Sequence, residues 1–179
     1  LPQPLEKIPG VTLISMGTGI AKPVIRGLSL NRVIVNDHGI KMEGQQWGFD
    51  HGLEIDQYDV ERIELIKGAT SLLYGSEGMG GVINILPPNS PDEGCLKADV
   101  LSLYRSNNHL FANSVGISGN HKKTFYRLRV TTQDFGDYRM PADEFTYNGF
   151  VLPLVNNRLK NTAGKERNVT GSIGIVRNW

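Results

Sequence analysis

Histidines and a cluster of glycines are the residues of this chain whose types and spacing suggest chemistry. His38 and His51 each follow an aspartate, and such a pair could ligate a metal ion. Solvated loop residues are the favoured interpretation, because the four histidines are scattered along the chain. Ser71, Ser76 and Cys95 have no base partner that would make them nucleophiles. The sequence therefore predicts no catalytic residue, no metal site and no cofactor, and gives no support to an enzyme.

The glycine cluster consists of Gly75, Gly78, Gly80 and Gly81. Closely spaced glycines allow backbone N–H groups to surround a phosphate, but phosphate loops follow a strand and open a helix. This cluster instead precedes an apolar run at residues 82–86 and has no Gly-Lys-Ser/Thr sequence. We therefore predict a tightly packed turn, and an enzyme that binds a phosphoryl group here is only a third hypothesis.

A segment with two large aromatic side chains between glycines, residues 43–52, is the candidate for ligand contact. Aromatic faces beside polar groups in a loop resemble a recognition surface. The alternative, weighted equally, is that both aromatic side chains fold back onto the core. The candidate ligand-binding residues are Gln45, Gln46, Trp47, Phe49, Asp50 and His51.

Composition excludes several classes of protein. The 179 residues suffice for one domain, or for one domain and a fragment of another. Nineteen basic and 18 acidic residues give a net charge of +1 without blocks of like charge, so we expect no nucleic-acid partner. The uncharged stretches at residues 8–21 and 78–91 are too short and too broken for a spanning helix of about 18 apolar residues. The chain starts at Leu1, so we expect that any signal peptide has been removed or left out.

A run of turn residues and prolines at 87–94 divides the chain. The first part, residues 1–91, has short apolar β runs closed by Gly, Pro or Asn/Asp, and predicts an α+β domain with a small mixed sheet and short helices. The predicted strands are residues 11–14, 24–25, 33–35, 63–66 and 82–86, with at most one helical turn at 70–74.

The second part, residues 92–179, predicts antiparallel β-structure. Residues 125–134 show a period of two, and residues 111–118 and 168–176 alternate more weakly. Within the first of these stretches one face reads Tyr126, Leu128, Val130 and Thr132, and the other reads Arg127, Arg129, Thr131 and Gln133. We expect a turn at residues 119–123 and a long loop at 134–167. Such strands occur both in soluble sandwiches and in outer-membrane barrels, and the pattern alone does not separate the two.

Six ordered blocks over about 85 residues resemble the plug domain of TonB-dependent outer-membrane receptors. Lys67-Gly68-Ala69 and Gly78-Met79-Gly80-Gly81 depart from the usual Arg-Gly-Pro and Ala-Ile-Gly-Gly but keep the charge and the glycines. The blocks are Ile8-Pro9-Gly10-Val11, Val24-Ile25-Arg26-Gly27, residues 32–39, residues 60–68, Leu73-Tyr74-Gly75-Ser76, and residues 80–85.

This resemblance implies a plug seated in an outer-membrane β-barrel of about 22 strands. Residues 1–91 would be the plug, and residues 92–179 would be the first antiparallel strands of an incomplete barrel. The implied function is gated, active uptake of a scarce ligand, such as an iron chelate or haem, across the bacterial outer membrane. The implied partners are an extracellular small ligand, the remainder of the barrel, and TonB, which would contact an N-terminal segment absent here.

A removable plug needs a polar boundary with its barrel, because a dry apolar boundary would be too stable to move. A charged cluster suits that boundary, and the resemblance implies barrel carboxylates opposite its cations; alternatively, the charges pair within the plug. The competing class is a soluble β-rich binding module for a sugar or peptide. Without the rest of a barrel, the second part should be partly disordered, least ordered at 134–167, or should self-associate. The boundary candidates are Arg26, Glu61, Arg62, Glu64 and Lys67.

Overall fold

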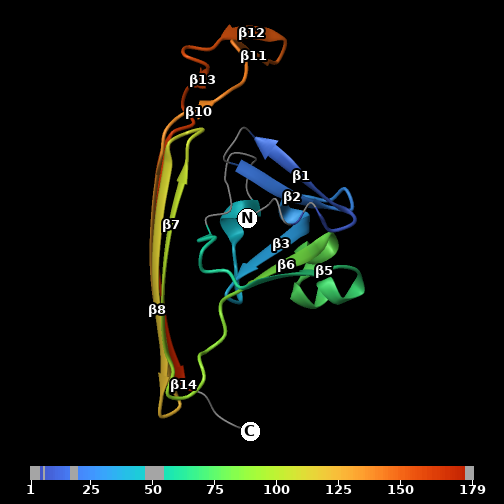
Figure 1. Ribbon diagram of the computed structural model, residues 1–179. Coiled ribbons are helices and arrows are strands. Elements are labelled where there is room, and N and C mark those ends of the chain that lie inside the picture. The colour runs from blue at the N-terminus through green and yellow to red at the C-terminus, as the bar shows by residue number, and fades with distance from the viewer. Residues whose placement is uncertain (1–4, 6, 17–19, 47–54, 176–179) are drawn as a thin grey trace. The chain divides into compact units, whose positions relative to one another are not determined.

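The computed structural model describes residues 5, 7–16, 20–46 and 55–175, and it divides the chain into two compact units (Figure 1). The first unit is Leu1–Asn89 and the second is Ser90–Trp179. The division lies inside the run of turn residues that the sequence shows at 87–94. In the described residues, no helix is both long and apolar enough to span a membrane.

The first unit contains a four-stranded mixed sheet in the order β4-β3-β6-β5. The two central strands are parallel, and each edge strand runs antiparallel to its neighbour. The runs predicted at residues 33–35, 63–66 and 82–86 all lie in this sheet. Its strands are β3 (Val33–Asp37), β4 (Ile40–Lys41), β5 (Arg62–Ile66) and β6 (Gly81–Leu86).

The other elements whose bounds the described part of the first unit shows are an antiparallel pair of strands and four short helices. Strand β1 (Val11–Met16) pairs with β2 (Ile20–Ile25), so both strands are longer than predicted. The predicted helical turn at 70–74 is present as η4, and every helix of the described residues is of the 3-10 type. The helices are η2 (Leu30–Arg32), η3 (Glu43–Gln46), η4 (Ala69–Tyr74) and η5 (Ser76–Met79).

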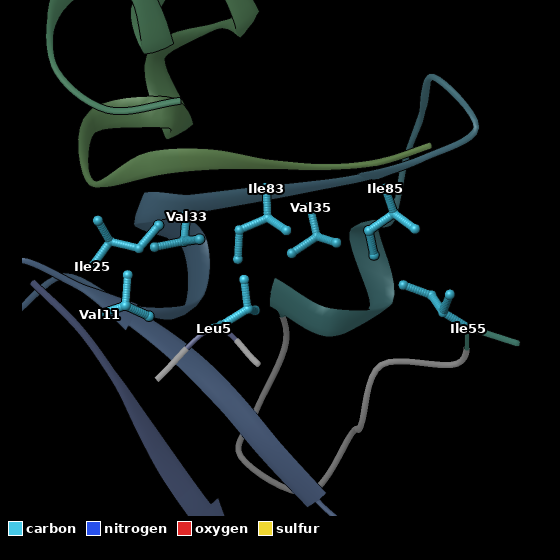
Figure 2. Close-up of a cluster of buried hydrophobic side chains, with 8 residues drawn as sticks. All are labelled: Leu5, Val11, Ile25, Val33, Val35, Ile55, Ile83 and Ile85. Atoms are coloured by element: carbon cyan, nitrogen blue, oxygen red, sulfur yellow. The ribbon is translucent and has the colours of Figure 1, made fainter. Parts of the chain in front are cut away.

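One hydrophobic core holds the first unit together. Side chains of β3 and β6 point to the same side of the sheet, toward side chains of β1 and β2 (Figure 2). Val33 and Val35 are fully buried, as is Ile25 at the end of β2. Because the two central strands are parallel and buried, their sequences read as continuous apolar runs. The core residues are Leu5, Val11, Ile25, Val33, Val35, Ile55, Ile83 and Ile85.

The second unit is built on a four-stranded antiparallel sheet in the order β14-β9-β8-β7. Its strands are β7 (Leu96–Arg105), β8 (Leu110–His121), β9 (Thr124–Phe135) and β14 (Gly164–Ile175). The turn predicted at residues 119–123 is shorter than expected, because β8 continues to His121. Lys122 and Lys123 alone form the turn, both with positive φ, as two-residue hairpin loops require.

The two faces of this sheet differ in character. One face carries exposed apolar side chains, including Val100, Val115 and Val130, which lie opposite one another on neighbouring strands. The other face is polar and buried at Ser114 and Arg129. The Arg129 guanidinium donates to both carboxylate oxygens of Asp99 at 2.8 Å and to the Ser114 hydroxyl at 2.9 Å.

Aromatic rings cover three glycines of the sheet on the facing strand. Tyr126 lies over Gly119, Phe125 over Gly174 and Phe135 over Gly164. A Cβ added at any of these glycines would come within 2.4 to 2.8 Å of the ring atoms. The rings therefore occupy the space that a larger residue would fill.

The connection between β9 and β14 was expected to be a long irregular loop, and this expectation is wrong. It contains two short antiparallel pairs, β10 (Tyr138–Arg139) with β13 (Arg158–Leu159) and β11 (Glu144–Tyr147) with β12 (Phe150–Pro153). Consecutive asparagines with positive φ, at 156 and 157, form the turn that precedes β13. Asparagine tolerates this conformation better than most residues, and two of them give a tight reversal.

Candidate functional site

The glycine cluster forms a closely packed turn between η4 and β6. A Cβ on Gly78 would lie 2.5 Å from the Ser71 carbonyl oxygen, and one on Gly80 would lie 2.8 Å from that of Arg32. The Ser71 hydroxyl lies within hydrogen-bond distance of the carbonyl oxygens of Gly68, at 2.7 Å, and Gly78, at 2.5 Å. These contacts explain Gly78 and Gly80 by packing, and the positive φ of Gly75 explains a third glycine by backbone conformation, which supports the predicted turn over a phosphate site.

A polar network joins this turn to β4 and η3. Glu77 accepts a hydrogen bond from the Lys41 ammonium and another, at 3.1 Å, from the Gln46 side-chain amide. The bond from Lys41 is the main reason that the pKa of Glu77 is lowered, and the bond from Gln46 acts in the same direction. The side-chain amide of Gln46, a predicted ligand residue, therefore donates a hydrogen bond within the first unit.

His38 lies in the β3–β4 turn between two carboxylates. Its Nδ1 is 2.8 Å from Asp37 Oδ1, and its Nε2 is 3.4 Å from Asp59 Oδ2. Asp59 is almost fully buried, whereas the His38 side chain is partly exposed. Histidine with positive φ, followed by a glycine with positive φ, suits a two-residue hairpin turn. Within the described residues, no group of three His, Cys, Asp or Glu side chains could hold a metal ion.

Most of the predicted ligand residues lie outside the part of the chain that the structure describes. Trp47, Phe49, Asp50 and His51 lie outside the described residues. Gln45 lies on η3, directly before Gln46. The role of these residues in ligand contact therefore stays a prediction.

Sequence reasoning missed a pocket in the second unit. It has a volume of about 610 Å³ and is lined by residues of β11, β12, β13 and the turns that flank β13. The sequence predicts a long loop over this region, and that prediction gives no indication of a binding site. The one signal that could have revealed a folded segment is the pair of asparagines at 156 and 157.

The TonB-dependent receptor plug domain is the family whose sequence pattern matches the chain, over residues 1–82. These residues, just under half of the chain, are similar to the plug domains of this family. The family resemblance that the six sequence blocks predict is thereby confirmed.

Curated relatives resemble the plug and little beyond it. The vitamin B12 transporter BtuB of Photobacterium profundum is 37% identical over 90 residues, which are 50% of this chain and 15% of the relative. The heme/hemopexin utilization protein C of Haemophilus influenzae is 38% identical over 91 residues, 49% of this chain and 12% of the relative. The chain thus spans less than a sixth of the relatives it matches.

A solved structure shares the fold over more of the chain. The siderophore receptor PirA from Acinetobacter baumannii matches with a TM-score of 0.58 and 20% identity, covering 79% of this chain and 23% of the receptor. The names of these proteins describe transport and reception, in keeping with the prediction that the chain is not an enzyme. The predicted localisation, the bacterial outer membrane, is likewise confirmed, since another relative is an outer-membrane protein of Vibrio cholerae.

Four of the five charged residues predicted to face the barrel have partners inside the plug. Arg62 pairs with Glu64 at 2.9 Å; the Arg62 side chain is largely exposed and the Glu64 side chain is partly exposed. Glu61 accepts a hydrogen bond from the Asn89 backbone at 2.7 Å. The Lys67 ammonium donates to the Pro9 carbonyl at 2.9 Å, and Arg26 is exposed. This geometry agrees with the alternative that the charges pair within the plug, and a further role at the barrel stays a proposal.

Proposed function

We propose that the chain is the plug and the first barrel strands of a TonB-dependent receptor that takes up a scarce ligand, such as an iron chelate or haem. One observation carries the proposal: a plug-domain sequence is followed by four antiparallel strands of 10 to 12 residues with one exposed apolar face. Strands of about this length and alternation cross the outer membrane in β-barrels.

The proposed mechanism makes and breaks no covalent bond. An extracellular ligand would bind the plug and the barrel loops, and TonB, through an N-terminal segment of the receptor, would then move the plug. The remainder of the barrel is the second partner. The relatives' names include vitamin B12 and heme, and one relative is iron-regulated, which supports uptake of a metal-containing nutrient.

The exposed Arg62–Glu64 pair suits a movable boundary. Exposed ion pairs stabilise a fold by about 0–1 kcal/mol, so partners can be exchanged at little cost. We propose that Arg26, Arg62 and Lys67 can pair with barrel carboxylates, and that Glu61 and Glu64 keep this surface hydrated.

A soluble β-rich binding module is not favoured. In a sandwich, a second layer would cover the apolar face of the large sheet. Val100 is 77% exposed and Ile173 is 78% exposed, so no second layer from the described residues of the second unit covers this face. In the wall of a membrane β-barrel, lipid would cover such an outward-facing apolar face.

Energised uptake tests the proposed function. The full-length receptor, produced in cells that lack their own receptors, should support growth on an iron chelate or haem only when TonB is present. Growth that does not depend on TonB would contradict the proposal.

Substitutions test the proposed ligand segment in the same cells. Trp47→Ala and His51→Ala should each weaken ligand binding several-fold, because aromatic and imidazole groups supply specific contacts. His121→Ala is the matched control, since His121 is exposed at the β8–β9 turn. Unchanged affinity with normal surface expression would contradict the assignment of Trp47 and His51.

A further inference from the structure

The connection between β9 and β14 encloses a pocket of the size that small molecules need. Its volume of about 610 Å³ falls within the range of about 300–1,000 Å³ typical of ligand sites. All its lining residues lie between Phe145 and Asn161, so a single folded segment builds it.

The walls of the pocket are apolar and its charges are all positive. Phe145, Leu152 and Val155 contribute apolar surface, and Leu152 and Val155 are about half exposed. Arg158 and Lys160 contribute the two charges, and the lining includes no aspartate or glutamate. Apolar walls with a few convergent polar groups are the usual composition of a small-molecule site.

Hydrogen bonds fix the backbone around this pocket. The Leu154 N–H donates to the Asp143 carbonyl at 2.8 Å, and the Arg158 N–H donates to the Val155 carbonyl at 3.2 Å. The Asn157 side-chain amide donates to the Ala142 carbonyl at 2.8 Å and to Asp143 Oδ1 at 2.7 Å. A pocket held in this way is formed before the ligand arrives, which lowers the entropic cost of binding.

Arg158 is held by two acceptors that lie outside the pocket lining. Its Nη1 donates to the Asp137 carbonyl at 2.9 Å, and its Nη2 lies 3.2 Å from His109 Nε2. A guanidinium only donates, so Nε2 must accept. We therefore assign the imidazole proton to Nδ1, which is 3.0 Å from the Tyr104 hydroxyl.

Lys160 provides the more mobile charge. It is exposed, and within the described residues no ion pair involves its ammonium. The pocket thus combines one held guanidinium with one ammonium that can move to meet an anion.

We propose that this pocket binds an apolar ligand that carries a carboxylate, with the apolar part against Phe145, Leu152 and Val155 and the carboxylate at Lys160 and Arg158. The inference deepens the proposed uptake function and rests on it only for the later fate of the ligand. Binding itself needs no TonB, so it can be measured separately from uptake.

Two probes of nearly equal shape, one anionic and one neutral, distinguish the contribution of charge to binding from that of apolar contact. Isothermal titration calorimetry on the detergent-solubilised, full-length receptor would compare 2-naphthoate with neutral 2-naphthalenemethanol. The acid should bind about tenfold more tightly, because one charge-assisted hydrogen bond accounts for such a factor. Equal affinities for the two probes would overturn the proposal.

Variants locate that preference. Lys160→Gln should abolish it, Lys160→Arg should keep it, and Val155→Asp should abolish binding of the acid by placing an anion at an exposed position of the wall. Lys165→Gln is the matched control, because Lys165 pairs with Asp134 on the neighbouring strand and does not line the pocket.

If Lys160→Gln and Val155→Asp bind the acid as the wild type does, the site is wrong even if TonB-dependent uptake is normal. If the variants behave as expected but uptake does not depend on TonB, the proposed function fails and the site stands.

Discussion

Gly78→Ala should destabilise the plug strongly for a change of one methyl group. The added Cβ would lie 2.5 Å from the Ser71 carbonyl oxygen, about 0.9 Å closer than ordinary contact at 3.4 Å. The clash is with backbone, so η4 must move; overpacking of this kind costs about 1–3 kcal/mol. Displacing Gly78 also weakens its bond with the Ser71 hydroxyl, which contributes about 1 kcal/mol. Together the free energy of unfolding should fall by about 2–4 kcal/mol.

Urea unfolding of a fragment of residues 1–91, followed by circular dichroism, would measure this loss. A domain of that size has a free energy of unfolding of about 5–14 kcal/mol, so the loss is large enough to resolve. Gly44→Ala is the control: nothing lies within 4 Å of its added Cβ, and the change should be under about 1 kcal/mol. If Gly78→Ala unfolds within about 0.5 kcal/mol of the wild type, close packing does not explain the glycine cluster.

Three further predictions concern the separate units. In the 1–91 fragment, backbone amides of residues 33–35, 63–66 and 82–86 should be protected from hydrogen exchange. If these amides exchange without protection, the plug does not fold on its own. The whole chain should self-associate in detergent-free buffer through its apolar face and open strand edges, and light scattering from a stable monomer would refute this. Glu77→Gln should lower stability at neutral pH by weakening the bond from Lys41. Because the folded-state pKa of Glu77 is lowered, the wild type's advantage should disappear as pH falls through that pKa, and urea unfolding at several pH values should show a shrinking difference.

The β-strands of both units could be predicted to a useful extent, because their signals are local. Residues 33–35 are a continuous apolar run and residues 82–86 are apolar except for Asn84, as is typical of buried parallel strands. Residues 125–134 alternate because β9 has one apolar and one polar face. Strand ends were less predictable: β8 runs through Gly119, Asn120 and His121, which are turn-forming residues by composition alone.

The polar networks could not be predicted, because they join residues that are distant in sequence. Lys41 and Glu77 are 36 residues apart and meet only because parallel pairing of β3 with β6 brings β4 beside the glycine turn. The pocket at residues 145–161 depends on the pairing of β10 with β13, two residues on each side, which leaves no periodic signal. Arg158 and His109 are 49 residues apart in sequence, so no local pattern indicates their contact either.

The rings over Gly119, Gly164 and Gly174 have a consequence for how the large sheet forms. A strand that slips by two residues keeps its apolar side chains on the same face, so burial alone hardly penalises the error. After such a slip, Tyr126 would face Ile117 or His121 in place of Gly119, and Phe125 would face Ser172 in place of Gly174. Each ring would then meet a side chain where it now meets open space above a glycine. The glycines therefore favour the native register, because only in that register does each aromatic ring lie over a residue without a side chain.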